Sequence, residues 1–502
     1  KKSVPNCRRI AIIGAGDAGV SLVREIRRGN TLEPVMFLDD DPSHIGMKIS
    51  GIPVCGPIND LPKLLEGTNV TDLVLAIPSC SPTRKKEILD LCTQTICRLR
   101  ILPDRVSQIA QSDGTSLLSQ MRNVQVEDLL GREPILLENE AVRPMISGRT
   151  VLVTGGGGSI GSELCRQIAA NHPKRLIILD NYENSTYDIQ QELLCKYGDS
   201  IQLTVIILSI QDGPRIREVF LQYRPELVFH AAAHKHVPLM EGNPDEAVKN
   251  NVFGTLNVVN AANESGVEKF VQISTDKAVN PTSVMGTTKR LCEMILSSMH
   301  TASKTEFVAV RFGNVLNSNG SVIPLFRRQI EQGGPVTITD RRVVRYFMTI
   351  SEAVSLVLRA GAMAEDSEIF VLDMGKPVRI VDLAENLIRL SGYTPNVDMP
   401  IVEVGLRPGE KLYEELLVDG THQKKTSHKL IFVDENHAVS PDEMAEMLRD
   451  LRAAADSGDR EQVLASLHRC VPDFRNPVDV NTAYLAEDYE DENCEAASAV
   501  SF

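Results

Sequence analysis

The run of residues 149–170, RTVLVTGGGGSIGSELCRQIAA, constrains the fold more than any other part of the chain. An apolar stretch that suits a buried strand leads into four consecutive glycines, and a helical pattern follows directly. Glycines at such a turn let backbone N–H groups approach a pyrophosphate at the N-terminus of the helix. The sequence therefore predicts a dinucleotide-binding unit here. The residues predicted to contact the cofactor are Thr154, Gly155, Gly158, Ser159, Ile160 and Gly161.

Two further segments support a dinucleotide. The apolar run RLIILD ends at Asp180, about 20 residues beyond the glycines, where a carboxylate accepts hydrogen bonds from the adenosine ribose. The same carboxylate would repel a 2′-phosphate, so NAD is favoured over NADP. After the strand candidate ELVFH, the small side chains of Ala231, Ala232 and Ala233 would let the cofactor lie close to the backbone.

A second glycine motif opens the chain. RRIAIIGAG predicts a strand that ends in Gly14-Ala15-Gly16-Asp17-Ala18-Gly19, and Asp39 follows the next strand candidate. A G-x-G-x-x-G pattern alone is weak, so this segment is either a working nucleotide site or a nucleotide-type fold kept as a scaffold. We expect this domain to have a regulatory or packing role.

The expected fold class is α/β, with two Rossmann-like doubly wound parallel-sheet domains in tandem. The predicted divisions are an N-terminal nucleotide-type domain (1–110), a connecting segment (111–148), a catalytic domain (149–436), a helical part (437–486) and an acidic tail expected to be disordered (487–502).

Composition excludes several classes of protein. The net charge of -14 argues against a general nucleic-acid binder. No run approaches the roughly 18 apolar residues needed to span a bilayer, and there is no secretory signal. The ten cysteines form no Cys-x-x-Cys pair, which favours reduced thiols. His230, His234 and His236 lack the further ligands of a recognisable metal set, so no metal is expected.

The sequence predicts a reaction site at Ser274-Thr275-Asp276-Lys277. It follows an apolar strand candidate (269–273), and ligands of doubly wound folds bind at the carboxyl ends of the strands. A helical pattern from about Met285 to Met299 comes next, and Met285 and Lys289 share a face of that helix. Other segments offer groups for an anionic substrate. Lys235 and His236 are predicted to face it, and Arg345 and Arg407 suit phosphate binding.

Taken together, these motifs resemble a known family. They are VLVTGGGGSIGSEL, HAAAHKHVPLME, ISTDKAVNPTSVMGTTKR, RFGNVLNSNGSVIPLF and RPGEKLYEEL. The resemblance is to the long, membrane-associated bacterial UDP-N-acetylglucosamine 4,6-dehydratases, and it covers nearly everything from Arg8 to Val433. It implies an extended short-chain dehydrogenase with a smaller C-terminal substrate-binding part. Such enzymes usually carry Tyr-x-x-x-Lys, and here Met285 replaces the tyrosine, which is itself a feature of this subfamily.

The resemblance implies an internal redox cycle on a tightly held NAD, which gives a 4-keto-6-deoxy sugar. Asp276 would protonate the departing C6 hydroxyl, and Lys277 would take the C5 proton, provided its neighbours lower its pKa. Thr275 would bond the C4 oxygen, and Lys289 would hold the nicotinamide ribose. Because Met285 cannot exchange a proton, Thr275 with Asp276, or a water, must accept the C4 hydroxyl proton.

The resemblance also carries expectations about partners. The UDP part of the sugar nucleotide would contact Asn314, Arg345 and Arg407, and Ser321 would also bind the substrate. The protein would be a homo-oligomer that acts in polysaccharide biosynthesis or protein glycosylation. Family members of this type have transmembrane helices ahead of the first domain. The start at Lys1-Lys2-Ser3 fits the loss of such a block, so the full-length protein is expected at the cytoplasmic face of the inner membrane. Two alternatives remain, a UDP-sugar 4-epimerase and a catalytically silent nucleotide-sugar-binding protein.

Overall fold

The structure is a computed structural model of the chain. The predicted acidic tail (487–502) and most of the predicted connecting segment lie outside the residues that it describes. Those residues are 7–28, 32–95, 97–102, 117–124, 128, 141–300, 303–365, 368–416, 423–434 and 439–486.

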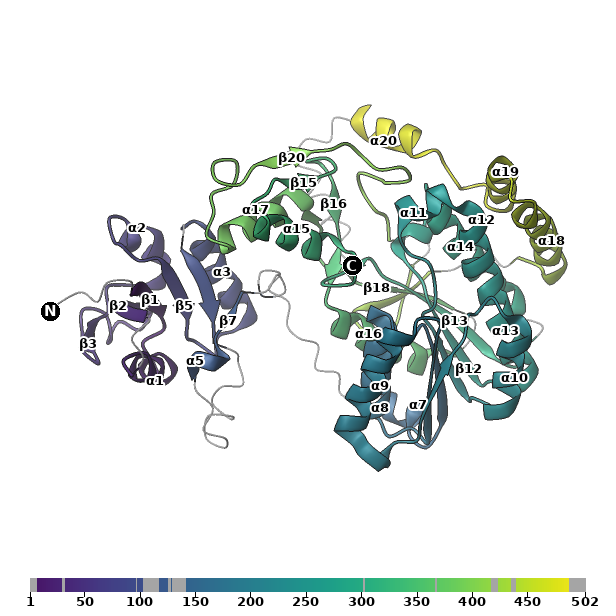
Figure 1. The fold of residues 1–502 in the computed structure, drawn as a ribbon, viewed down its shortest axis with the longest axis horizontal. Helices are drawn as coiled ribbons and strands as arrows, with labels where there is room; N and C mark the ends of the chain where they lie inside the picture. The colour runs from purple at the N-terminus through teal and green to yellow at the C-terminus, as the bar shows by residue number, and fades with distance from the viewer. Residues whose placement is uncertain are drawn as a thin grey trace. The chain divides into compact units, whose positions relative to one another are not determined.

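A nine-stranded sheet forms the centre of the larger part of the molecule (Figure 1). Seven strands are parallel, and the last two, at one edge, are antiparallel to their neighbours. In spatial order the strands are β10 (Leu203–Ile207), β9 (Arg175–Asp180), β8 (Thr150–Thr154), β11 (Leu227–His230), β12 (Lys269–Ile273), β13 (Glu306–Arg311), β18 (Ile369–Leu372), β22 (Ile431–Asp434) and β21 (Gln423–Lys425).

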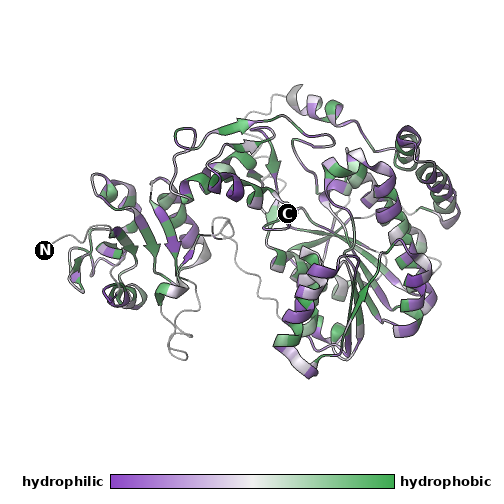
Figure 2. Ribbon diagram, viewed as in Figure 1, coloured by the Kyte–Doolittle hydropathy of each residue, from purple (hydrophilic) through white to green (hydrophobic). Residues whose placement is uncertain are grey.

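Helices cover both faces of this sheet, which explains why its inner strands are continuously apolar (Figure 2). Alternate residues of each strand point into opposite cores: Leu152 packs on one face, and Val151 and Val153 pack on the other. The first face is covered by α10 (Gly213–Tyr223), α13 (Gly254–Ser265) and α14 (Val284–Met299), and the second by α7 (Val142–Ile146), α8 (Ser159–Ala170), α9 (Glu183–Tyr197) and α16 (Ile350–Met363).

The N-terminal domain repeats the plan at a smaller scale. Its sheet has the order β2-β1-β5-β6-β7, and only β7 is antiparallel to its neighbour. The helices and strands are β1 (Arg8–Ile13), α1 (Asp17–Ile26), β2 (Leu32–Leu38), β3 (Lys48–Ile49), β4 (Ile52–Pro53), α2 (Leu61–Leu65), β5 (Asp72–Leu75), α3 (Pro82–Thr93), β6 (Arg98–Ile101), α5 (Leu117–Gln120) and β7 (Arg122–Asn123). The predicted α/β class with two Rossmann-like domains is confirmed.

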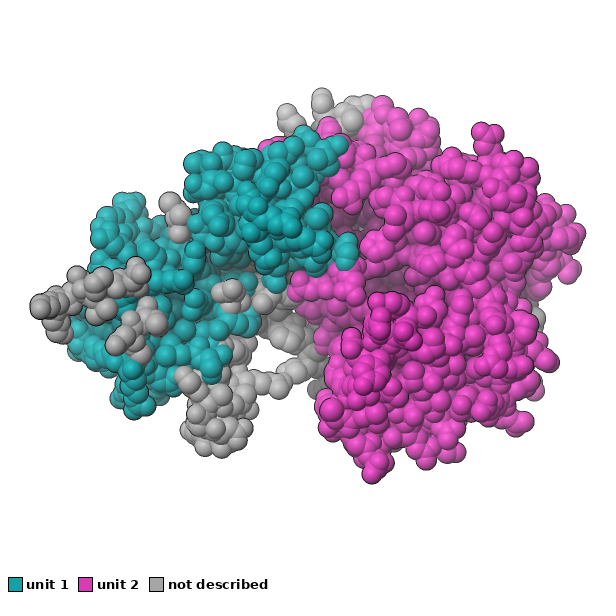
Figure 3. All heavy atoms as spheres, viewed as in Figure 1, with its two compact units in different colours: residues 1–134, 320–338, 381–404 teal, residues 135–319, 339–380, 405–502 magenta. Residues whose placement is uncertain are grey.

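Contacts divide the chain into two compact units (Figure 3). The first contains residues 1–134, 320–338 and 381–404, and the second contains 135–319, 339–380 and 405–502. The first unit thus includes α15 (Val322–Glu331), β15 (Val336–Ile338), β20 (Ile401–Glu403) and all of α17 (Ile380–Leu390) except its first residue. The second unit holds β14 (Asn314–Val315), β16 (Val344–Arg345), β17 (Phe347–Met348), β19 (Val378–Arg379), α18 (Pro441–Ser457), α19 (Arg460–Cys470) and α20 (Pro477–Ala486). No helix in the described part of the chain is long and apolar enough to cross a membrane.

Candidate functional site

The glycine loop between β8 and α8 is packed so tightly that side chains are excluded. Gly155 has φ +68°, and a Cβ there would lie 2.6 Å from the backbone N of Ala232. A Cβ on Gly161 would collide with the carbonyl oxygen of Gly155. The predicted cofactor residues of β8, the loop and Ala231–Ala233 are therefore neighbours in space. Such a cradle leaves backbone N–H groups at the start of α8 open to a pyrophosphate.

Asp180 closes one side of this loop. Its Oδ2 accepts a hydrogen bond from the backbone N of Gly157 at 2.9 Å, and its Oδ1 accepts one from Tyr182 N at 2.9 Å. The carboxylate thus stands beside the loop at the end of β9, as the sequence predicts. In the N-terminal domain Asp39 is held in the same way, by the backbone N of Ala15 and of Asp41.

His230 lies in the core beneath the loop rather than in a metal site. Its Nδ1 is 2.7 Å from Thr154 Oγ1, and its Nε2 is 2.9 Å from Thr255 Oγ1. Burial, with a contribution from the Lys289 ammonium, lowers the pKa of His230 to about 3, so the ring is neutral at physiological pH. Its two hydrogen bonds tie β8 and β11 to α13.

The predicted catalytic triplet follows β12 at the carboxyl edge of the sheet. One oxygen of Asp276, Oδ1, accepts hydrogen bonds from Thr275 Oγ1 at 2.7 Å and from Lys277 Nζ at 3.0 Å. Lys277 Nζ also donates to Asn314 Oδ1 at 3.2 Å. The other oxygen of Asp276 is buried and has no hydrogen-bond partner among the residues that the structure describes. The structure thus brings Thr275, Asp276, Lys277 and Asn314 together.

The pKa of Lys277 is shifted in the direction opposite to the one that its predicted role as a base requires. Burial favours a lower pKa, but the carboxylates of Asp276 and Glu414 outweigh it, and the pKa of Lys277 is raised. The expected base is therefore an ammonium in this arrangement, and the condition that its neighbours lower its pKa is not met. A lysine that is to accept a proton must first lose one.

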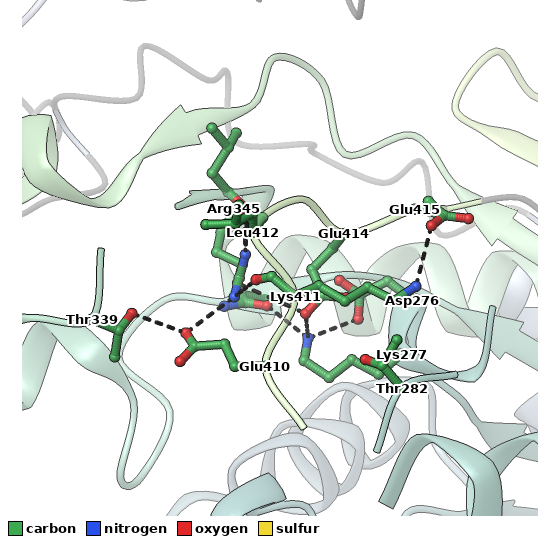
Figure 4. Close-up of polar contacts among 12 residues, drawn as sticks. Asp276, Lys277, Thr282, Thr339, Arg345, Glu410, Lys411, Leu412, Glu414 and Glu415 are labelled. Carbon is green, nitrogen blue, oxygen red and sulfur yellow. Dashed lines mark hydrogen bonds and ion pairs between the residues drawn. The ribbon is translucent and has the colours of Figure 1, made fainter. Parts of the chain in front are cut away.

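Glu414 is the site residue that sequence reasoning missed. Its Oε1 lies 3.6 Å from Lys277 Nζ and 3.8 Å from Arg345 Nε, and the side chain is 5% exposed (Figure 4). Burial raises the pKa of Glu414, but Lys277, Arg345 and Lys411 outweigh burial and lower it. The run GLRPGEKLYEEL drew attention only to its cations, because a glutamate in a charged run usually lies on a solvated surface.

Arg345 holds the segment that carries Glu414. Its Nη1 donates to the carbonyl oxygens of Val344 and Leu412, and its Nη2 donates to Lys411 O at 2.8 Å and to Glu410 Oε1 at 3.2 Å (Figure 4). Arg345 is buried, and these bonds use most of its donors. Its predicted contact with phosphate remains a prediction. Arg407 is exposed on the same loop.

The other two predicted catalytic residues lie on α14. Lys289 Nζ donates to the carbonyl oxygen of Ile273 at 2.6 Å, so it lies against the end of β12, and burial lowers its pKa. Met285 is 4% exposed and belongs to the core on this face of the sheet. It lies on the helix one turn before Lys289, where it offers no group that exchanges a proton.

The predicted substrate residues fall in two places. Lys235 Nζ donates to the carbonyl oxygen of Asn319 at 2.8 Å, and the backbone N of Asn319 donates to Ser159 Oγ at 3.2 Å. Asn319 therefore joins the glycine loop to Lys235. His236 precedes a short helix, α11 (Val237–Gly242), and burial lowers its pKa. Ser321 belongs to the first compact unit, where it directly precedes α15 without a side-chain hydrogen bond to the helix.

A buried ion network lies directly under the triplet. Arg311 donates from Nε and Nη2 to both oxygens of Glu293 at 2.7 Å, and from Nη1 to Asp434 at 2.6 Å. Ser274, the first residue after β12, donates to Glu293 at 2.6 Å. Although burial favours a higher pKa, Arg311 outweighs it and lowers the pKa of Glu293 to about 2. The network ties α14, β13 and β22 to the strand end that carries the triplet.

The fold and this site define the chain as an extended short-chain dehydrogenase of the nucleotide-sugar dehydratase and epimerase type. The family model for the polysaccharide biosynthesis protein matches residues 151–436, and the chain belongs to that family. A model described as a CoA-binding domain matches residues 4–103.

Several known proteins are similar to the chain. The probable polysaccharide biosynthesis protein EpsC of Bacillus subtilis is 50% identical over 411 residues, which are 82% of this chain and 68% of EpsC. The capsular polysaccharide biosynthesis protein CapD of Staphylococcus aureus is also 50% identical, over 81% of this chain and 68% of CapD. A UDP-N-acetylglucosamine 4,6-dehydratase (inverting) of Campylobacter jejuni is 32% identical over 59% of this chain and 84% of its own. The X-ray structure of Pen from Bacillus thuringiensis is 33% identical with a TM-score of 0.53, and it covers 59% of this chain and 88% of its own.

Proposed function

We propose that the chain is a UDP-N-acetylglucosamine 4,6-dehydratase that uses NAD. The observation that carries the proposal is the sharing of one Asp276 oxygen by the Thr275 hydroxyl and the Lys277 ammonium. A carboxylate, an ammonium and a hydroxyl thus share one hydrogen-bonded group at the carboxyl edge of the sheet, and these are groups that could serve as acid, base and hydrogen-bond donor. The 32% identity to a protein named UDP-N-acetylglucosamine 4,6-dehydratase (inverting) supports the same reaction.

The glycine loop fits NAD, because without side chains at Gly155 and Gly161 the loop packs closely against Ala231, Ala232 and the start of α8, where backbone N–H groups can approach a pyrophosphate. Thr154, Gly155, Gly158 and Gly161 would hold it, with Asp180 on the ribose hydroxyls. When bound, NAD would take hydride from C4 of the sugar and return it to C6. Asp180 favours NAD over NADP because a 2′-phosphate beside its carboxylate would be repelled.

The chain's own residues would move the protons. The Thr275 hydroxyl would bond the C4 oxygen and pass its proton to Asp276 along the 2.7 Å hydrogen bond. Asp276, now protonated, would give that proton to the departing C6 hydroxyl, which leaves as water. The Lys277 amine would take the C5 proton and return it after hydride reaches C6. This route accounts for the C4 proton without a tyrosine, and Met285 takes no part in it.

The direct test is incubation with UDP-N-acetylglucosamine followed by mass spectrometry. We expect a product lighter by one water, and proton NMR should show a C6 methyl group together with the C5 configuration. A substrate of unchanged mass would refute the dehydratase.

Asp276→Asn tests the acid. An amide cannot protonate the C6 hydroxyl, so we expect dehydration to fall by about 100-fold or more. A 4-epimerase would also lose its route for the C4 hydroxyl proton, so the product of the wild-type protein separates the two reactions: an epimer keeps the mass of the substrate. A silent nucleotide-sugar-binding protein is the third candidate. Reduced-nicotinamide absorbance on mixing with substrate would exclude it.

A further inference from the structure

We infer that Glu414 accepts the proton of the Lys277 ammonium during the reaction, so that the freed amine can take the C5 proton, and returns it at the end. The inference rests on the proposed dehydratase function. It assigns a role to a carboxylate that lies outside the triplet, on a loop far along the chain.

The geometry suits a proton acceptor. Glu414 Oε1 is 3.6 Å from Lys277 Nζ, the separation of an ion pair, and a shift of a few tenths of an ångström would make it a hydrogen bond. Glu414 Oε2 is buried and has no hydrogen-bond partner among the described residues, so no donor on that oxygen stabilises the ionised carboxylate. The other charged groups around the pair are Asp276, Arg345 and Lys411.

Lys277 must lose a proton before it can act as a base. Beside the carboxylates of Asp276 and Glu414 its pKa is raised, so it is an ammonium and cannot take a proton from C5. When Thr275 has passed the C4 proton to Asp276, Lys277 loses one of its two stabilising carboxylates. Transfer of its proton to Glu414 then turns an ion pair into two neutral groups, and this change becomes more favourable as substrate excludes water.

The protons balance over the cycle. The C4 hydroxyl proton goes through Thr275 to Asp276 and leaves in the water formed at C6. The Lys277 proton goes to Glu414, and the N–H bond lost is replaced when Lys277 takes the C5 proton. After hydride reaches C6, Lys277 returns a proton to C5 and Glu414 returns its proton to Lys277. All three residues end as they began.

Glu414 is held in place from two sides. Lys411 Nζ donates to the carbonyl oxygen of Val279, just after the triplet, and Thr282 Oγ1 donates to Gly409 O. On the other side, the Asn481 side chain in α20 donates to Glu410 O at 2.9 Å and accepts from Leu412 N at 2.9 Å. The loop that carries Glu414 is thus fixed against the triplet by hydrogen bonds at several points.

Glu414→Gln tests the inference, because the amide keeps the size of the side chain and cannot accept the proton. We expect kcat for dehydration to fall about 100-fold near pH 7 with little change in KM, and C5 proton exchange with D₂O to slow equally. The Lys277 side chain is 22% exposed, so its proton can still leave to solvent. The rate of the variant should therefore rise with pH, by up to about tenfold per unit, whereas the wild-type rate should stay flat between about pH 7 and 9.

Glu415→Gln is the matched control. Glu415 lies on the same loop as Glu414, and its carboxylate accepts hydrogen bonds from Lys411, Asn280 and Tyr484. The Glu415→Gln substitution therefore perturbs the loop without removing the proposed proton acceptor, Glu414. The control should keep the flat profile. Glu414→Asp keeps a carboxylate and should also keep the flat profile at a reduced rate, which preserves the test if the glutamine variant does not fold.

Two results would overturn the inference. If Glu414 only raises the pKa of Lys277, its removal would leave more free amine, and the C5 exchange of Glu414→Gln would be equal to wild type or faster at pH 7. A pH-dependent rate in Glu414→Asp would have the same meaning. These results differ from failure of the proposed function, in which the wild-type protein itself forms no dehydrated product.

Discussion

At Asp276, one carboxylate oxygen accepts two hydrogen bonds and the other accepts none among the described residues. In the proposed mechanism the C4 proton arrives on Oδ1, the oxygen bonded to Thr275, so the second oxygen, Oδ2, carries no proton in that route. A Cβ added to Gly313 would come within 3.3 Å of this oxygen, so the backbone there gives the carboxylate its space. The position of the Asp276 carboxylate thus depends on its neighbours Thr275, Lys277 and Gly313 as well as on the preceding strand, β12.

His230 should make stability depend on pH. Its pKa is about 3 in the folded protein and about 6.5 when unfolded, so the unfolded chain binds the proton first. The resulting stability is complete above pH 6.5 and is lost as pH falls toward 3, by at most about 1.4 kcal/mol per pH unit. We expect His230→Gln to be less stable at pH 7 but to have a shallower slope between pH 6 and 4. Urea denaturation at each pH measures this, and parallel slopes for the two proteins would contradict it.

Some residues of the site can be predicted from the sequence, and others cannot. Asp180 and the triplet were predicted because they follow strand patterns at fixed positions, where a fold of this class places its ligands. Glu414 and Glu293 were not, because nothing in sequence distinguishes a buried glutamate from a solvated one until its cation is located. The raised pKa of Lys277 depends on Glu414, so it was missed for the same reason.

At the scale of elements, the two glycine loops share a geometry. Gly14 and Gly155 both have positive φ, and a Cβ on Gly19 or Gly161 would collide with the carbonyl oxygen of Gly14 or Gly155. The pattern that predicts both loops is local, which explains why sequence found them. The strand β22 is not predicted from the sequence, because four residues are too few to show a reliable hydrophobic periodicity. Its pairing partner, β18, is also distant in sequence.

Gly161→Ala should separate the cofactor loop from the rest of the fold. The added methyl group has no room beside Gly155, so the loop must open and lose its fit to a pyrophosphate. We expect the variant to retain little NAD and to lose dehydratase activity, with a modest fall in melting temperature. Gly16→Ala is the control, because its Cβ meets nothing within 4 Å. Full NAD retention by Gly161→Ala, measured after denaturation and chromatography, would contradict the assignment of this loop.

For the whole molecule, the net charge is -14, and the cations around the triplet do not reverse its sign locally. Lys277, Arg345 and Lys411 each lie beside carboxylates, which are those of Asp276, Glu410, Glu414 and Glu415. A negative protein disfavours a nucleic acid, whose long backbone would meet the whole surface.

The two nucleotide-type domains should respond differently to NAD. We expect isothermal titration of NAD-free protein to show a single NAD per chain, because only the second glycine loop would serve the reaction. A ligand at 100 times its Kd stabilises the part that binds it by about 2.7 kcal/mol. Gly161→Ala should abolish the binding, whereas Gly16→Ala should not. A second equivalent of tightly bound NAD would show that the N-terminal domain is also a dinucleotide site.

The ion pair between Arg311 and Asp434 determines when, during synthesis of the chain, the buried network under the triplet can be completed. Asp434 lies 123 residues after Arg311, whereas Glu293 lies 18 residues before it. At roughly 5–20 residues per second, the ribosome adds Asp434 about 6–25 s after Arg311. Until then Arg311 has Glu293 but not Asp434, and β22 has not yet paired with β18. We expect the nascent chain to carry an unfinished site for that interval, so the sugar nucleotide meets a working enzyme only when the last strands have been added.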